Sequence, residues 1–401
     1  MGTVRVRGGR TDGQADRRSV GREERVAPQL DLLPRRLAAP PPRLPVLDER
    51  SSRGAKFIGL PVSSVLNTPA STGMDFWSIN PYVGCEFGCM YCYARDTHRW
   101  TMERAVGRSG GRADGRTRGR AIPNGEEDDV TSDRLSARPP VRLSPEEAFE
   151  KEILVKTDAA EVLKRTLNPA KLAGHSLVIG TATDPYQPAE RQFGLTRQIL
   201  KALRSYQGLS IEIITKSTLV TRDLDILQAL STRHDVTVNI SLATADARLA
   251  RLLELRSPVP AARLRALRRL IESGIYAGLL VAPIIPGVTD DWTGLARLIE
   301  AAKEAGARYV VGSALRLGPA ARHRFLPFLA REFPALAERY RRHYAGKDHV
   351  SQSYQDALTR RLRLLKQTFG FSIEESRRRR QQLGDRIRKE TADLVEQAVL
   401  L

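Results

Sequence analysis

The chain has 401 residues, 41% of them hydrophobic, which is enough for one barrel-sized catalytic domain with appendages. No apolar run reaches the length of a membrane span, and no apolar segment follows the arginine-rich start. We therefore expect a cytoplasmic protein without membrane contact. We also expect a monomer. The formal net charge of +19 favours a polyanionic partner such as nucleic acid, although an arginine-rich composition alone would also produce this charge.

Two segments are rich in Arg, Gly, Pro and acidic residues and lack periodic apolar positions. They are a basic tail at residues 1–54 and an insertion at about 107–140. We expect both to lack fixed structure and to carry no chemistry. The chain then divides into this tail, a catalytic domain at 55–318 that contains the insertion, and a basic helical C-terminal extension at 319–401.

Short apolar, β-branched runs alternate with longer helical patterns through the catalytic domain. The predicted strands are Phe76–Ile79, Leu177–Gly180, Ile211–Ile214, Val236–Ile240, Tyr276–Ile285 and Tyr309–Gly312. The predicted helices are Pro145–Leu167, Thr196–Tyr206, Arg222–Leu230, Ala261–Ser273 and Thr293–Ala305. Six such units predict an α/β fold, a partial (β/α)6 barrel of the TIM type, with its site at the carboxyl ends of the strands.

Cys85, Cys89 and Cys92 are the only cysteines of the chain and follow the pattern C-x3-C-x2-C. Three thiolates at this spacing can ligate three irons of a [4Fe–4S] cluster and leave the fourth iron open for S-adenosylmethionine (SAM). A zinc site would need a fourth ligand, for which His98 is the nearest candidate, and a ferredoxin-type cluster would need a fourth cysteine. An odd cysteine count without a secretory signal argues against a disulfide.

The cysteine motif, with Tyr91 before its last cysteine, resembles the radical SAM superfamily. The string Cys92-Tyr-Ala-Arg95 and the segment from Thr183 to Glu190 resemble its spore photoproduct lyase-like branch, over about residues 55–320. This resemblance implies that the reduced cluster cleaves SAM to a 5′-deoxyadenosyl radical, which abstracts hydrogen from a substrate. It also implies an external electron donor of the flavodoxin or ferredoxin type.

The resemblance further implies which residues contact SAM. Thr183 and Asp184 would meet its methionine ammonium group, and Lys216, which closes an apolar strand, would meet its carboxylate. An ST-turn followed by Asp-Pro turn punctuation is the competing explanation for Thr183 and Asp184. The remaining expected contacts are Tyr91 and Ile284 at the adenine, Ser241 at the ribose, and Tyr93.

One position departs from the branch pattern. The cysteine that returns a hydrogen atom in spore photoproduct lyase is replaced at the matching place by Thr181, whose O–H bond is too strong for that task. Tyr186 is the candidate catalytic hydrogen donor in its stead, near Gln187 and Glu190. We expect a nucleic-acid base or nucleotide as substrate. A peptide or small metabolite, or a non-catalytic iron–sulfur protein that binds DNA or senses redox state, are the alternatives.

Overall fold

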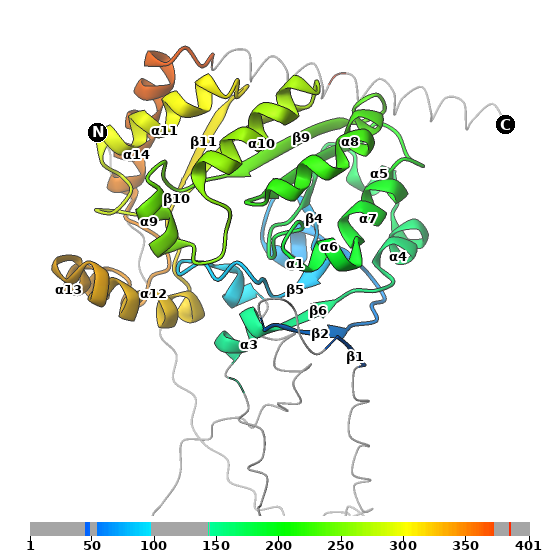
Figure 1. Ribbon diagram of the computed structural model, residues 1–401, viewed down its shortest axis with the longest axis horizontal. Coiled ribbons are helices and arrows are strands. Elements are labelled where there is room, and N and C mark those ends of the chain that lie inside the picture. Colours follow the sequence, from blue (N-terminus) through cyan, green and yellow to red (C-terminus); the bar gives the residue numbers. More distant parts are fainter. Residues whose placement is uncertain (1–44, 49–53, 98–142, 144, 373–384, 386–401) are drawn as a thin grey trace, which may run out of the picture. The chain divides into compact units, whose positions relative to one another are not determined.

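The computed structural model describes residues 45–48, 54–97, 143, 145–372 and 385 (Figure 1). The tail up to residue 44, the insertion expected at 107–140, His98 and the arginine run from 377 to 380 lie outside the described residues. Strand β1 (Val46–Asp48) lies within the segment that we expected to lack structure, and it pairs antiparallel with β2 (Lys56–Gly59).

The main sheet has seven strands in the order β11-β10-β9-β8-β7-β4-β3. All six strands from β4 to β11 in this sheet run parallel, and only β3 at the edge is antiparallel to its neighbour. This confirms the six predicted strands and the partial barrel. Their bounds are β3 Leu66–Asn67, β4 Trp77–Ile79, β7 Ser176–Ile179, β8 Ser210–Thr215, β9 Asp235–Ser241, β10 Tyr276–Ile284 and β11 Val310–Ala314.

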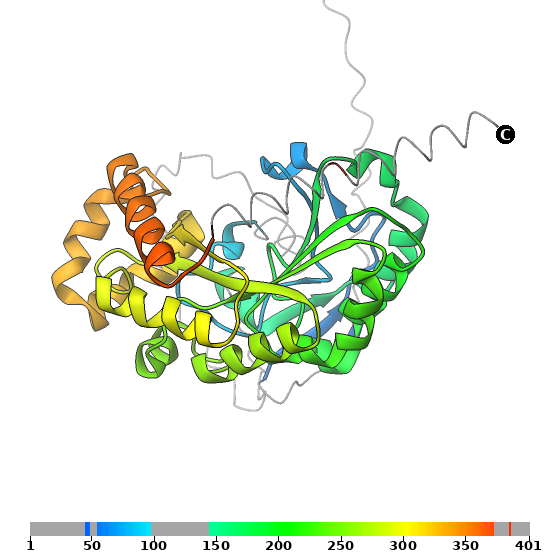
Figure 2. The same ribbon diagram turned by 90° about the horizontal axis from the view of Figure 1, so that it is seen from above.

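Helices connect the parallel strands and lie along one side of the sheet (Figure 2). Local signals explain their starts: for example, the Asp291 carboxylate accepts the N–H of Gly294 at 2.7 Å and so caps α11. Their bounds are α4 Ala159–Thr166, α5 Pro169–Leu172, α6 Ala189–Phe193, α7 Leu195–Leu203, the 3-10 helix η1 Thr218–Asp223, α8 Leu224–Ser231, α9 Ala247–Leu253, α10 Pro260–Glu272 and α11 Trp292–Glu304. A short helix, α1 (Pro69–Thr72), precedes β4.

A second sheet, which we did not predict, has the strand order β1-β2-β6-β5. The single helix predicted at Pro145–Leu167 is wrong: it is α3 (Pro145–Lys151), strand β6 (Glu152–Val155) and then α4. The run Ile153-Leu154-Val155 is fully buried because β6 pairs with β2 on one side and with β5 (Tyr82–Val83) on the other. This long-range pairing outweighs the local helical pattern.

The described part of the C-terminal extension consists of α12 (Pro319–Glu332), α13 (Pro334–His343) and α14 (Gln352–Thr368). The carboxylate of Asp96 accepts the N–H groups of Ala320 at 2.7 Å and Ala321 at 3.2 Å, so it caps α12. Helix α14 packs instead against α11 and β11.

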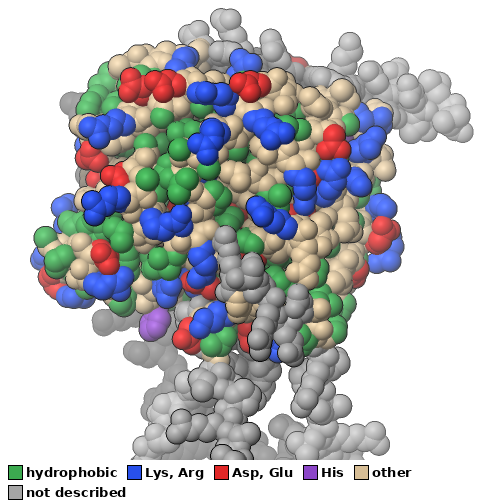
Figure 3. Space-filling view, viewed as in Figure 1, with side chains coloured by type: hydrophobic (Ala, Val, Ile, Leu, Met, Phe, Trp, Pro, Cys, Tyr) green, Lys and Arg blue, Asp and Glu red, His purple; other side chains and the backbone are tan. Residues whose placement is uncertain are grey.

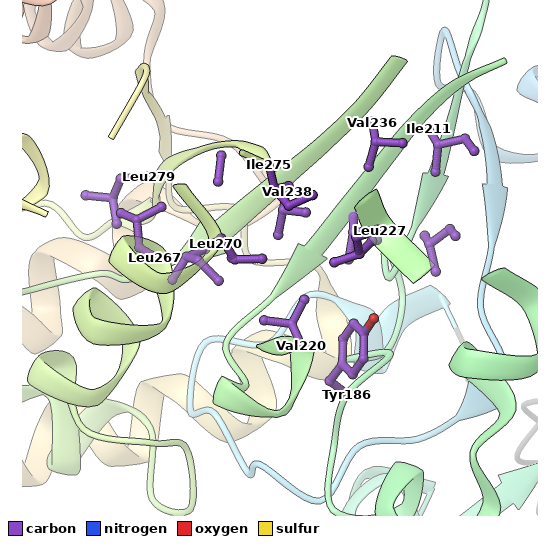
Figure 4. Packing of buried hydrophobic residues seen from close by; sticks show 14 of the residues in the cluster. Tyr186, Ile211, Val220, Leu227, Val236, Val238, Leu267, Leu270, Ile275 and Leu279 are labelled. Carbon is purple, nitrogen blue, oxygen red and sulfur yellow. The ribbon is translucent and has the colours of Figure 1, made fainter. Parts of the chain in front are cut away.

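The largest apolar core lies between the parallel strands and their helices (Figure 4). Ile211 and Val238 from the strands, and Leu227 and Leu267 from the helices, are fully buried there. A second apolar cluster joins the cysteine segment to α12 and α13, including Phe325. The sheet therefore fixes where the strand ends lie, and the second cluster links the cysteine segment to α12 and α13.

Candidate functional site

The three cysteines lie on one loop that begins directly after β5. Gly84 and Gly88 turn this loop, with φ values of 87° and 66°. A Cβ on Gly84 would stand 2.7 Å from the carbonyl oxygen of Phe149, so the backbones approach too closely there for a larger residue. The same carbonyl accepts the N–H of Cys85 at 2.8 Å. All three thiols are free; Cys85 and Cys89 are buried and Cys92 is half-buried.

Burial controls the protonation of these thiols. It raises the pKa of Cys85 well above its usual value and raises the pKa of Cys89 to about 12. The free thiols of Cys85 and Cys89 are therefore neutral, and binding of iron must release their protons. Within the residues that the structure describes, no three Cys, His, Asp or Glu side chains converge on one point that would hold a single metal ion. An iron–sulfur cube takes its thiolates at separate irons and does not require such convergence.

Side chains that follow β7 hold the cysteine loop from one side. The Thr183 hydroxyl donates to the carbonyl oxygen of Gly84 at 2.6 Å, and the Gln187 amide donates to the same oxygen at 3.1 Å. The amide oxygen of Gln187 accepts the N–H of Glu86 at 3.0 Å. Thr183 and Gln187 therefore fix the backbone on both sides of Cys85 relative to the carboxyl end of β7.

Asp184 connects the carboxyl ends of β7 and β8. Its carboxylate accepts the Thr215 hydroxyl at 2.7 Å, the backbone N–H of Lys216 at 2.7 Å and the N–H of Tyr186 at 2.9 Å. Burial raises the pKa of this carboxyl above its usual value, while the three donors act in the opposite direction. Because its oxygens receive protein donors, Asp184 holds the backbone from which Lys216 projects.

The Lys216 ammonium group lies close to the cysteine loop. Its Nζ is 5.8 Å from the centroid of the Tyr91 ring, a cation–π distance. Burial would lower the pKa of Lys216, but the nearby Cys89 and Glu254 outweigh it and raise this pKa, so the group is cationic. Among the described residues no acceptor lies within hydrogen-bond distance of this Nζ. The residue is half-buried, and its cation has no anionic partner of its own there.

Tyr91, Glu254 and Arg263 form a buried triad, which we call the 91–254–263 triad. One carboxylate oxygen of Glu254 accepts the Tyr91 hydroxyl, and the other pairs with the guanidinium of Arg263. Both members of this ion pair have side chains only 1% exposed. Arg263 also donates to the carbonyl oxygens of Ser241 at 2.9 Å and Pro258 at 2.7 Å. The triad therefore ties Tyr91 in the cysteine motif to the carboxyl end of β9.

The segment between α9 and α10 lies along the cysteine loop. The N–H of Met90 donates to the carbonyl of Leu253 at 2.9 Å, and the N–H of Arg256 donates to the carbonyl of Phe87 at 3.1 Å. Cys89 and Glu254 form an antiparallel bridge between these bonds. The cysteine loop is thus backed by a short two-stranded pairing.

Three arginines gather on one carboxylate beside this pairing. Glu150 forms ion pairs with Arg95, with Arg256 at 2.5 Å and with Arg324 at 3.4 Å. The Arg256 guanidinium would stand 2.6 Å from a Cβ on Gly88. Burial alone would raise the pKa of Glu150, but the guanidinium groups outweigh it and hold this pKa below its usual value. Glu150 on α3 therefore links Arg95, next to the cysteines, with Arg256 in the segment after α9.

The other expected SAM contacts lie at strand ends around the loop. The Tyr93 hydroxyl donates to the carbonyl of Thr181, while the residue as a whole stays 41% exposed. Ser241 ends β9, and its hydroxyl donates to the carbonyl of Ala282 at 3.2 Å. Ile284 ends β10 and is fully buried. The structure therefore brings residues from β7, β8, β9 and β10 to the same edge of the sheet as the cysteines.

Comparison with known proteins identifies the family, since the radical SAM superfamily model matches residues 79–299. The chain belongs to the radical SAM superfamily. An uncharacterized protein of Mycobacterium tuberculosis is 30% identical over 320 residues, which are 78% of this chain and 82% of that protein. An uncharacterized protein of Methanocaldococcus jannaschii is 27% identical over 212 residues, 53% of this chain and 61% of that protein.

Among solved structures, a mutant of spore photoproduct lyase with dinucleoside spore photoproduct has the same fold as the present chain. It aligns with a TM-score of 0.51 and 14% identity, over 78% of this chain and 79% of that chain. The superfamily implies a [4Fe–4S] cluster and SAM, and the residues present fit both. The three free thiols share one tight loop, and an ammonium group without an acceptor among the described residues stands beside it.

Tyr186 does not lie where we expected it in this radical SAM chain. Its side chain is 1% exposed and packs in the main core beside Val220 (Figure 4). Gln187 and Glu190 are fully buried as well. Glu190 accepts the Tyr82 hydroxyl at 2.6 Å and pairs with Arg222 at 2.7 Å. Its carboxylate is therefore engaged by buried protein groups and does not face a substrate site. The role of Tyr186 as hydrogen donor stays a prediction, and its burial argues against that role.

Sequence reasoning missed Glu254 and Arg263 as parts of the site. One signal was present: Glu254 is the only acidic residue among seven arginines between residues 247 and 270. A lone carboxylate in such a stretch points to a specific ion pair.

No helix of the described residues is long and apolar enough to cross a membrane.

Proposed function

We propose that Cys85, Cys89 and Cys92 bind a [4Fe–4S] cluster and that the surrounding strand ends bind SAM. The bound pair would supply a 5′-deoxyadenosyl radical able to abstract hydrogen from a substrate. The observation that carries this proposal is the cationic Lys216, which faces Tyr91 of the cysteine motif and has no protein acceptor among the described residues.

Lys216 is the natural partner for the carboxylate of SAM. A partly desolvated ammonium group that makes no hydrogen bond to the described residues favours an anion that can accept its protons directly. Asp184 positions this lysine by accepting its backbone N–H at 2.7 Å. We therefore give Asp184 a positioning role, whereas direct contact with the ammonium group of SAM was our expectation from sequence. Thr183 keeps one lone pair for such a contact while its proton bonds the Gly84 carbonyl.

The adenosine part of SAM would lie between the aromatic residues and the ends of β9 and β10. Tyr91 offers a ring whose orientation is fixed through Glu254, and Tyr93 offers a second, partly exposed ring. Ser241 and Ile284 occupy the ends of β9 and β10, where a ribose hydroxyl and an adenine edge would meet backbone groups. The loop from Pro81 to Met90, on the cysteine side of this region, is buried throughout, which limits the access of water there.

We infer a nucleic-acid base or nucleotide as the substrate class. Two observations support this: the fold shared with a lyase solved with a dinucleoside spore photoproduct, and the net charge of +19, which favours phosphate groups. An outside protein of the flavodoxin or ferredoxin type would supply the electron.

The test is anaerobic reconstitution with iron and sulfide, followed by reduction with dithionite in the presence of SAM. We expect close to four irons per chain in the wild type, 5′-deoxyadenosine as product, and loss of both after Cys89→Ala. Lys216→Ala should keep the iron and weaken SAM binding about tenfold or more. Lys201→Ala, which removes an exposed lysine on α7, is the matched control. Zinc in place of iron, or normal SAM affinity in the Lys216 variant, would contradict the proposal.

The substrate class needs its own measurement. Unlabelled SAM is combined with candidate oligonucleotides that carry deuterium either at their sugar carbons or at their methyl carbons. Transfer of deuterium into 5′-deoxyadenosine then shows which kind of position is attacked. Transfer from no nucleotide, together with normal SAM cleavage, would refute the substrate assignment while leaving the enzyme class intact.

A further inference from the structure

The outer face of α9 combines basic and apolar side chains. Arg248, Arg251 and Leu252 recur at i, i+3 and i+4 and so share one side of α9, and Leu255 lies in the turn that follows the end of the helix. All four are exposed, Leu252 to 40% and Leu255 to 38%, while Ala250 and Leu253 form the buried side. We call these four residues the α9 face.

Positive charge dominates this region of the surface. Between residues 246 and 270, five arginines are exposed against one exposed acidic residue, Asp246. Glu254 and Arg263 neutralise each other in the interior. Figure 3 shows blue side chains spread among green ones over α9 and α10. A partner for this face should therefore be acidic.

The α9 face stands directly behind the cysteine loop. The backbone of Leu253, between the two exposed leucines, accepts the N–H of Met90 at 2.9 Å, and Glu254 bridges to Cys89. A molecule docked on the face would be separated from the cysteines by about one helix diameter, ~10–12 Å. Electron transfer through protein falls steeply with distance, so this is a short path into the loop.

We propose that the α9 face docks an acidic, one-electron donor protein that reduces the iron–sulfur cluster. This inference rests on the proposed function. The donor loses one electron and the oxidised cluster gains it. No proton is transferred, and no covalent bond is formed or broken. The exposed leucines favour a protein over nucleic acid, because protein interfaces place apolar side chains at their centre, whereas phosphate-binding surfaces are polar.

The chain contains a matched control surface. Arg360, Arg363 and Leu364 on α14 repeat the same i, i+3, i+4 chemistry, and all three are exposed, Leu364 to 52%. However, α14 packs on α11 and β11 and makes none of the described hydrogen bonds to the cysteine loop. If charge alone decided docking, both faces would bind the donor protein equally well. Their difference is that only the α9 face lies beside the cysteine loop.

The experiment compares Arg248→Glu/Leu252→Glu with Arg360→Glu/Leu364→Glu. Arg248 lies in the first turn of α9, where a glutamate suits the helix dipole, and Leu252 faces solvent, so the α9 variant should fold. Binding of a purified acidic flavodoxin is measured by calorimetry on cluster-free and cluster-loaded protein. The rate of cluster reduction by flavodoxin hydroquinone is followed by stopped-flow absorbance.

We expect the α9 variant to bind flavodoxin at least about tenfold more weakly in both forms and to be reduced correspondingly slowly. The α14 variant should match the wild type, and dithionite should reduce all three proteins alike. Equal losses in both variants, or no loss in the α9 variant, would overturn the proposal. So would weaker oligonucleotide binding with unchanged flavodoxin binding, which would assign the face to nucleic acid. If dithionite yields no SAM cleavage in the wild type, the proposed function fails, and the binding comparison still decides the docking.

Discussion

Replacing Glu254 with glutamine should destabilise the protein far more than a typical surface change. The substitution removes the charge that compensates Arg263, whose side chain is 1% exposed, and weakens the acceptor of the Tyr91 hydroxyl. Breaking a buried pair from one side costs about 3–5 kcal/mol. Arg263 keeps two backbone acceptors, at Ser241 and Pro258, so we expect about 3 kcal/mol, the lower end of that range.

The assay is urea denaturation of cluster-free protein under reducing conditions, with the double variant Glu254→Gln/Arg263→Met completing a cycle. Removing both charges leaves no buried ion, so the double variant should lose about 2 kcal/mol less than the sum of the single losses. Additive losses, or a loss below about 1 kcal/mol for Glu254→Gln, would refute the reasoning.

A second triad of the same chemistry provides the control. Glu190 accepts the Tyr82 hydroxyl at 2.6 Å and pairs with Arg222, whose side chain is 29% exposed. Water can hydrate Arg222 after Glu190→Gln, so its loss should be smaller, about 1–2 kcal/mol. If the 91–254–263 triad positions the cysteine motif, only Glu254→Gln will also lower SAM affinity after reconstitution. An equal effect in the Glu190 variant would mean that both act through stability alone.

Three further changes test other parts of the structure. Gly84→Ala should lose iron-binding capacity, because its Cβ would stand 2.7 Å from the Phe149 carbonyl oxygen. Gly274→Ala has a similar positive φ but no neighbour within 4 Å, so it should cost only backbone strain of about 1–2 kcal/mol. Iron content after reconstitution distinguishes the two variants. The lowered pKa of Glu150 stabilises the fold fully above its unfolded value, and this stability is lost as the pH falls through the folded pKa. Glu150→Gln should therefore flatten the acid limb of a plot of unfolding free energy against pH, and an unchanged limb would contradict the assignment. Asp96→Ala should lower the free energy of unfolding by about 1 kcal/mol and speed amide exchange at the start of α12. Asp291→Ala should have the same effects at α11 only. Unchanged amide exchange in α12 of the Asp96 variant would show that Asp96 does not cap this helix.

The sequence by itself determined the cysteine motif and the six parallel strands. Ile211–Ile214 and Val236–Ile240 are short runs rich in β-branched apolar residues, and this pattern is local, so both strands could be recognised without knowing their neighbours. The placement of Lys216 followed from the same logic, because the residue that ends such a run lies at the edge of the sheet where the cysteines are.

Only the tertiary structure decided which polar residues meet. Glu254 and Tyr91 are 163 positions apart, and no local pattern links a helix end to a cysteine motif. The same holds for β6, whose strand conformation comes from its partners β2 and β5 and not from its own helix-like surroundings. Tyr186 shows the converse: its neighbourhood in sequence suggested an open site, but it is buried in the main core together with Val220 of η1 and Leu227 of α8. Periodicity reports which face of an element is buried, whereas the identity of the residues across that face depends on how the whole chain closes.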